Sequence, residues 1–231
     1  MPSVKATFVS CRVLTRAALV AGLLMMVLIP VPVARSDEQG APTEPVVRVE
    51  EVWGLVLNVP DDSVTSPQFH TVMSPFGNTD SFYAQVVWNY REVPDFTAGG
   101  LELEVWNGES LIHSKSGRED PLSTTTETVL WTQVLETNGG VLSFRIQNGQ
   151  SVTWGTFGEG LVVTVPGGPG NLNDYSPDVS VNSSCVTYGS NRVDILAILE
   201  VRYYGQNGLL AVDGTPRIVV YRLDDLQVPE E

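Results

Sequence analysis

The sequence predicts an all-β fold, an antiparallel sandwich of two sheets with a jelly-roll-like arrangement, preceded by an N-terminal signal helix. Short segments with alternating apolar and polar residues recur along most of the chain, and turn residues separate them. Beyond the N-terminal region, no stretch shows apolar residues at helical spacing over two or more turns. About a dozen short strands at this spacing imply two packed sheets.

The first 36 residues are expected to form a secretory signal. Three basic side chains, Lys5, Arg12 and Arg16, precede thirteen apolar or small residues at Ala17–Ile29. The small residues Ala34 and Ser36 then occupy the −3 and −1 positions of a cleavage site after Ser36. The apolar run is shorter than the roughly 20 residues that span a bilayer, which favours a cleaved signal over a retained anchor. The sequence therefore predicts a secreted, periplasmic or cell-envelope protein with no further membrane segment.

The rest of the chain divides into a polar leader at residues 37–45, a sandwich domain at residues 46–226 and an acidic tail at residues 227–231. Cleavage removes four basic residues and no acid, so the formal net charge changes from −14 to −18. Such a charge repels phosphate backbones and excludes nucleic acid as a partner. Cys185 is then the one remaining cysteine, so an internal disulfide is impossible.

Turn residues delimit the expected strands. Asn107-Gly108, Asn148-Gly149 and Asn207-Gly208 are typical of tight hairpin turns, because both residues tolerate a positive φ. The expected strands are Val46–Val59, Phe69–Met73, Phe82–Tyr90, Leu101–Trp106, Ser110–His113, Thr128–Leu135, Val141–Ile146, Val152–Trp154, Leu161–Val165, Val193–Tyr204, Leu209–Val212 and Arg217–Tyr221.

Within the strand at Leu101–Trp106, the alternation predicts that Leu101, Leu103 and Val105 face the core while Glu102 and Glu104 face water. Two carboxylates at i and i+2 lie roughly 6.5–7 Å apart at the backbone, on the scale that glycoside hydrolysis uses. Glu102 and Glu104 are therefore weak catalytic candidates, and a solvated strand face in an acidic protein is the favoured interpretation.

Aromatic residues give the candidate ligand contacts. Strand tryptophans usually lie in a core, but Trp106 ends a strand just before a turn, and Trp154 is flanked by threonine and glycine that suit close approach of a ligand. Trp154 and Trp106 are the candidate stacking residues, with a core position for Trp154 as the alternative.

The stretch at Pro166–Ser184 is the longest predicted loop, and loops of this length are usually functional or mobile. Its oxygen-bearing side chains, Asn171, Asn173, Asp174 and Asp178, are weak candidates for a calcium site. Asn and Asp also bond their own backbone in turns, which is the simpler interpretation. No other cofactor is expected.

Transition-metal and nucleophilic chemistry have little support. The chain has two histidines, His70 and His113, without metal-ligand spacing. Cys185 would need one of them beside it to form a thiolate pair, and nothing in the sequence brings them together. A buried, inert thiol is the favoured interpretation for Cys185.

The stretch from Gly99 to Arg118, the Asn148-Gly149 pair and Thr153–Gly158 resemble uncharacterised exported bacterial β-sandwich proteins. The layout is also similar to the concanavalin-type lectin and glucanase sandwich, in length and strand number alone. The glucanase pattern sets its two working acids four residues apart with an acid between, whereas here Val105 and Trp106 follow Glu104. No site residue is carried over from that resemblance.

These observations favour a non-enzymatic exported domain that binds a ligand, with a glycan or another envelope component as its partner. The first alternative is a structural or assembly component of the envelope that uses an exposed sheet edge. The second is a glycan-active hydrolase that uses Glu102 and Glu104. The sequence does not determine the oligomeric state or the order of strands in the sheets.

Overall fold

The computed structural model describes residues 44–222 except 61–62, 65, 90–99 and 123–124. These residues belong to one compact unit of the chain, Glu44–Glu231. The predicted signal at residues 1–36, most of the leader and the tail at residues 227–231 lie outside the described residues. No helix within the described ranges is long and apolar enough to cross a membrane.

The structure confirms an all-β fold with two antiparallel sheets of eight and five strands, as counted over the described residues. This agrees with the architecture that the sequence resemblance implies, and the jelly-roll-like arrangement stays a prediction. The larger sheet has the order β12 (Gly208–Asp213), β11 (Val193–Gly205), β1 (Arg48–Leu57), β6 (Glu127–Asn138), β7 (Val141–Ser151) and β8 (Gly155–Phe157), with β13 (Arg217–Tyr221) also paired with β11 and β9 (Val162–Pro166) with β7. The smaller sheet has the order β10 (Cys185–Tyr188), β2 (Gln68–Met73), β3 (Phe82–Trp88), β4 (Leu101–Asn107) and β5 (Ser110–Arg118).

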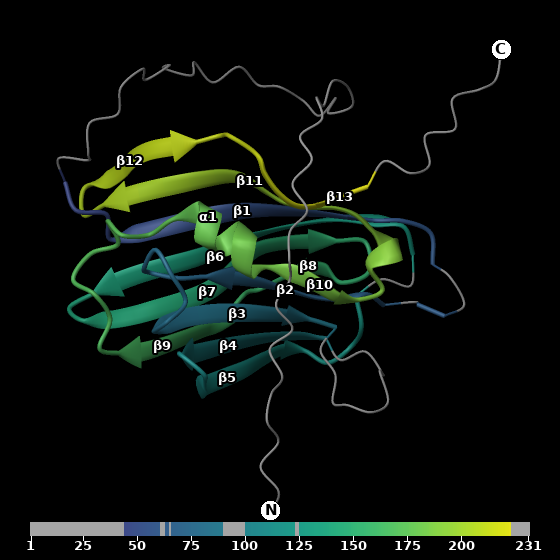
Figure 1. The fold of residues 1–231 in the computed structure, drawn as a ribbon, viewed down its shortest axis with the longest axis horizontal. Helices are drawn as coiled ribbons and strands as arrows, with labels where there is room; N and C mark the ends of the chain where they lie inside the picture. Colours follow the sequence, from purple (N-terminus) through teal and green to yellow (C-terminus); the bar gives the residue numbers. More distant parts are fainter. Residues whose placement is uncertain (1–43, 61–62, 65, 90–99, 123–124, 223–231) are drawn as a thin grey trace, which may run out of the picture. The chain divides into compact units, whose positions relative to one another are not determined.

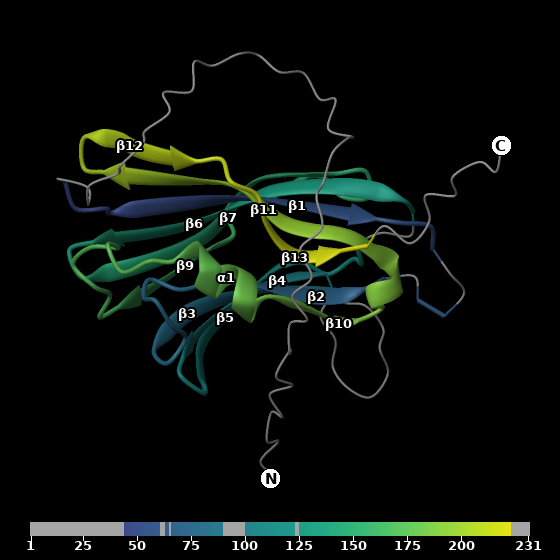
Figure 2. The same cartoon turned by 45° about the horizontal axis from the view of Figure 1, so that its top comes forward.

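Strands β2 to β5 form a meander in which each strand pairs with the next, as Figure 1 shows. A short helix, α1 (Pro177–Ser183), packs against β2 of the smaller sheet and against β11 and β13 of the larger one (Figures 1 and 2). A single turn of 3-10 helix, Ser190–Arg192, precedes β11. The smaller sheet is therefore continuous from β2 to β5, and α1 bridges the two sheets beside β2.

Four tryptophans pack together in the core between the sheets. Trp88 lies 4.4 Å from Trp131 and 5.9 Å from Trp154 between ring centroids, and Trp53 stacks on Trp131 at 5.9 Å. All four are at most 5% exposed. Because each ring can bury about 150–250 Å² of surface, this cluster supplies much of the apolar contact that holds the sheets together without a disulfide.

Two local predictions are wrong. Asn148-Gly149 does not form a hairpin turn but lies inside β7, where Asn148 has φ of 56° and the register to β6 shifts between Leu130 and Thr132. This is a β-bulge, and it needs glycine because a Cβ at Gly149 would lie 2.4 Å from the Phe157 ring. Val152–Trp154 forms the turn between β7 and β8 instead of a strand.

The predicted loop at Pro166–Ser184 contains α1. The helix has only seven residues and no apolar periodicity. Its proline at the first turn is compatible with a helix start, but a helix of this length depends on tertiary contacts for its stability. The sequence pattern therefore gave no signal for it.

Candidate ligand-binding face

The sheet register brings three predicted site residues together on the side of β4 that points away from the core. Leu101, Leu103 and Val105 are buried in the core, so Glu102, Glu104 and Trp106 share the opposite side. In the pairing of β3 with β4, the residues directly opposite these three are Val87, Gln85 and Tyr83, respectively. We call these six residues the β3–β4 face.

The aromatic part of the β3–β4 face is ordered by stacking and by a hydrogen bond. The rings of Tyr83 and Trp106 are nearly parallel, with an interplanar angle of 6° and a centroid separation of 6.4 Å. Trp106 Nε1 donates a hydrogen bond of 2.9 Å to Glu104 Oε2. Tyr83 is 4% exposed, whereas Trp106 is partly exposed. Stacking on Tyr83 and the hydrogen bond to Glu104 therefore fix the orientation of the Trp106 side chain, which is partly accessible to solvent.

The carboxylate of Glu104 lies at the centre of the β3–β4 face. Its Oε2 also accepts a hydrogen bond of 3.4 Å from Gln85 Nε2. Burial raises the pKa of Glu104; the hydrogen bond from Trp106 opposes this shift, and the charge of Glu102 adds to it. Burial and the charge of Glu104 likewise raise the pKa of Tyr83.

Strand β5 adds hydroxyl groups to the same side of the sheet. Ser114 pairs in register with Glu104, and Ser116 pairs with Glu102, and both serines are exposed. Together with these two serines, the β3–β4 face presents an aromatic surface, a carboxamide, two carboxylates and two hydroxyls. Such a set can stack on an apolar ring face and exchange hydrogen bonds with a hydroxyl-rich ligand.

Trp154, the other candidate stacking residue, lies in the core and away from Trp106. It is 5% exposed and packs against Trp88 and Phe157, with a centroid separation of 5.3 Å from Phe157. The guanidinium carbon of Arg118 lies 5.4 Å from its ring centroid. The turn between β7 and β8 directs this indole inward, so it presents no open face to a ligand.

Three of the four calcium candidates use their side chains in contacts within the protein, and the fourth, Asp174, is exposed. Asn171 Oδ1 accepts a hydrogen bond of 3.0 Å from the backbone N–H of Asn173, and Asn173 Oδ1 accepts one of 3.0 Å from Val46 N–H. Asp178 forms an ion pair of 3.4 Å with Arg217. No group of three or more His, Cys, Asp and Glu suited to a metal occurs among the residues that the structure describes. Calcium binding stays a prediction.

The structure brings Cys185 beside His70, a contact that the sequence did not indicate. The two residues are register partners of β10 and β2, and Cys185 Sγ lies 3.5 Å from His70 Nε2. That nitrogen also lies 3.2 Å from the Ser183 carbonyl oxygen, which can only accept a hydrogen bond. Burial lowers the pKa of His70, which disfavours an imidazolium beside a thiolate. The contact therefore lacks the charge that activates a cysteine nucleophile.

A second feature missed in the sequence is the fully buried carboxyl group of Glu51. Trp53 Nε1 donates to Glu51 Oε2 at 2.8 Å, Tyr175 Oη donates to Oε1 at 2.6 Å, and Ser180 Oγ donates to Oε1 as well. Burial raises the pKa of Glu51 from 4.5 to about 7, although the three hydrogen bonds oppose this shift. The cluster ties the segment that contains α1 to β1.

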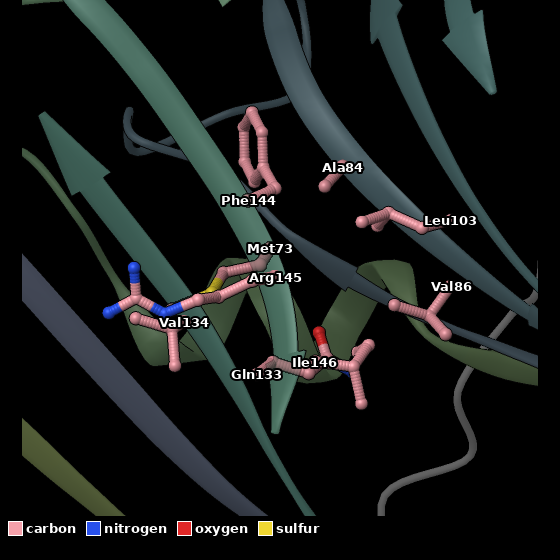
Figure 3. A pocket seen from close by; sticks show the side chains of 9 residues that line it. All are labelled: Met73, Ala84, Val86, Leu103, Gln133, Val134, Phe144, Arg145 and Ile146. Atoms are coloured by element: carbon pink, nitrogen blue, oxygen red, sulfur yellow. The ribbon is translucent and has the colours of Figure 1, made fainter. Parts of the chain in front are cut away.

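A small space lies between the sheets and is lined mainly by apolar side chains, as Figure 3 shows. This space is about the size of a single water molecule, whereas ligand pockets typically have about 300–1,000 Å³. Ala84 and Leu103 line it from the core side of β3 and β4. This space belongs to the core packing and is separate from the β3–β4 face.

One edge of the larger sheet carries exposed apolar side chains. Both β12 and β13 pair with β11, and Leu209, Val212, Ile218 and Tyr221 on them are 37–55% exposed. This edge is the feature that an assembly role would use, and that role stays a prediction.

Comparison with known proteins does not assign this chain to a family. No family model matches the chain, and no curated protein matches it. Among solved structures, the chain is similar to the full-length tailspike protein 2 from Escherichia coli O157:H7 bacteriophage CAB120, with 12% identity and a TM-score of 0.32. The match covers 79% of this chain and 24% of that one, so the chain spans about a quarter of the tailspike's length. A likeness of this degree identifies neither fold nor function.

Proposed function

We propose that this protein is an exported, non-catalytic carbohydrate-binding domain whose ligand contacts the β3–β4 face. The observation that carries the proposal is the partly exposed indole of Trp106, held by Glu104 beside the carboxamide of Gln85. A pyranose ring presents an apolar C–H face that stacks on an indole, and its hydroxyls donate to carboxylates and exchange hydrogen bonds with amides. Both requirements are met within two neighbouring strands.

The predicted export signal supports the same proposal. A signal at residues 1–36 would deliver the domain to the envelope or outside the cell, where polysaccharides are abundant partners. The strongly acidic charge disfavours nucleic acid and anionic membrane surfaces. A glycan is the partner class that agrees with both the compartment and the chemistry of the face.

A glycan and polysaccharide array tests the proposal, using the exported protein with calcium and with chelator. Hits are then titrated by calorimetry with Trp106→Ala, for which we expect at least a tenfold loss of affinity, or about 1.4 kcal/mol. Tyr221→Ala is the matched control, because it removes an exposed aromatic ring from the other sheet. No binding to any glycan, or unchanged affinity of Trp106→Ala, overturns the proposal.

A glycan hydrolase is the second candidate, and the raised pKa of Glu104 favours it. A carboxyl group that keeps its proton at higher pH can act as a general acid, with Glu102 as the partner carboxylate. Release of reducing ends from the array hits, lost in Glu102→Gln with Glu104→Gln, would support this candidate. Hydrolysis that survives the double change rules it out.

A further inference from the structure

We infer that the β3–β4 face selects a cationic amino sugar, a glycan that carries primary ammonium groups. This inference rests on the proposed function and names its ligand class. It depends on how charge is distributed over the described part of the smaller sheet and on the position of the Trp106 indole.

Six carboxylates elsewhere in the described structure have a cationic partner, and those of the β3–β4 face do not. Ion pairs join Arg48, Arg118, Arg145, Arg202 and Arg217 to acidic residues outside this face. Among the described residues, Glu102 and Glu104 form no ion pair. Five arginines thus pair with other acids, and the charges of Glu102 and Glu104 lie side by side without an arginine partner.

The neighbouring strands bring no positive charge to the face. On β5, the register partners are Ser114 and Ser116, whereas Lys115 pairs with Leu103, and its Nζ donates a 2.8 Å hydrogen bond to the Gly160 carbonyl. Lys115 therefore lies on the other side of the strand.

On the other side of β3, the register partners in β2 are Val72 and His70. Burial lowers the pKa of His70, which keeps its imidazole neutral at pH 7. Neither Lys115 nor His70 therefore brings a cation to the face. An anionic sugar would meet two carboxylates and no counter-charge, whereas an ammonium group would be attracted.

The Trp106 indole adds a second attraction for an ammonium group. A cation close to an indole face is favoured by the ring quadrupole. Glu104 Oε2 is occupied by Trp106 and Gln85, while Oε1 accepts no hydrogen bond from the described residues. Oε1 can therefore accept a hydrogen bond from a ligand N–H beside the indole, and charge-assisted hydrogen bonds of this kind are stronger than neutral ones.

Three oligosaccharides of equal length test the inference: β-1,4-linked glucosamine, N-acetylglucosamine and glucose, titrated by calorimetry at a pH that protonates the amines. We expect the glucosamine oligomer to bind at least about tenfold more tightly than the other two, with a preference that weakens as salt is added. Glu102→Gln and Glu104→Gln should each weaken glucosamine binding about two- to fivefold. Glu159→Gln, which removes the same charge from an exposed turn of the larger sheet, should leave it unchanged.

The outcomes separate the inference from the function on which it rests. Equal binding of all three oligomers, or a preference for the N-acetylated or glucose form, overturns the inference and leaves carbohydrate binding intact. A loss with Glu159→Gln as large as with Glu102→Gln also overturns it, because the attraction would then come from the net charge of the whole protein. If no oligomer binds and the array detects no bound glycan, both the inference and the proposed function are wrong.

Discussion

Glu51 should make the stability of this domain depend on pH. Its side chain is fully buried, and burial raises its pKa from 4.5 to about 7 against the opposing effects of Ser180, Tyr175, Trp53 and the charge of Arg217. A raised carboxyl pKa means that the folded state holds the proton more tightly than the unfolded state. Stability from this group is therefore fully present below pH 4.5 and decreases as the pH rises towards 7.

The magnitude follows from the size of the shift. At 1.36 kcal/mol for each pKa unit, the change from 4.5 to about 7 corresponds to about 3 kcal/mol of unfolding free energy. This loss of unfolding free energy should be complete a little above pH 7, and a further rise in pH should not increase it. Asp213 acts in the opposite direction, because Arg217 and Thr215 lower its pKa from 3.8, but its effect falls below the pH window of Glu51.

Glu51→Gln isolates this contribution because glutamine does not titrate. The variant also places an amide N–H₂ near the N–H of Trp53, which costs about 1–3 kcal/mol independently of pH. The quantity to compare is therefore the dependence of the unfolding free energy on pH. It is measured in both proteins by urea unfolding, followed by tryptophan fluorescence, from pH 4.5 to 8.5. His70, whose pKa is lowered by burial, titrates in both and cancels in the difference.

We expect the difference in unfolding free energy between the native protein and Glu51→Gln to shift by about 3 kcal/mol across this range, in favour of the variant at high pH. Parallel pH profiles would refute the reasoning, since they would mean that Glu51 has the same pKa folded and unfolded. Tyr175→Phe offers an independent check. It removes a donor to Oε1, so the pKa of Glu51 should rise further and the decline should extend to higher pH.

The remaining expectations concern packing and accessibility. Trp154→Ala should lower the unfolding free energy by about 3–5 kcal/mol in urea titrations while leaving glycan affinity unchanged, because the indole is core and not ligand contact. Gly149→Ala should lower the midpoint of urea unfolding, since its Cβ would meet Phe157 at 2.4 Å, whereas Gly214→Ala, with no atom within 4 Å, should not. Cys185 is 8% exposed, so a thiol reagent should label it much more slowly in the native protein than in urea; equal rates would contradict its burial.

Alternation along the strands predicted the candidate face because it is a local property. A side chain's direction from a strand reverses at every residue, so Leu101, Leu103 and Val105 in the core determine the opposite position of Glu102 and Glu104. Strand order and register are long-range properties, and the partners Tyr83 and Gln85 could not be read from β4 alone. The pairing of Cys185 with His70 was out of reach for the same reason.

Trp154 and the Asn148-Gly149 pair show where local patterns mislead. Glycine beside an aromatic residue suggested ligand approach, and Asn-Gly between apolar runs suggested a hairpin. In the fold, Gly149 makes room for the Phe157 ring, and Phe157 packs edge-on against Trp154. The small residues serve the aromatic core, and nothing in the sequence distinguishes room for a core ring from room for a ligand.

The segment at residues 166–184 was the longest predicted loop, and its contacts argue for a structural role. The backbone of Leu172 donates to the Val46 carbonyl, Asn173 accepts from Val46, and Thr137 donates its hydroxyl to the Pro169 carbonyl. Further along, Ser180 donates to the buried Glu51. The side chains of Asn173 and Ser180 are thus used to anchor this segment to the sandwich. The β-sheet register directs Glu102, Glu104 and Trp106 outward from β4, and these are the groups that the proposed experiments change.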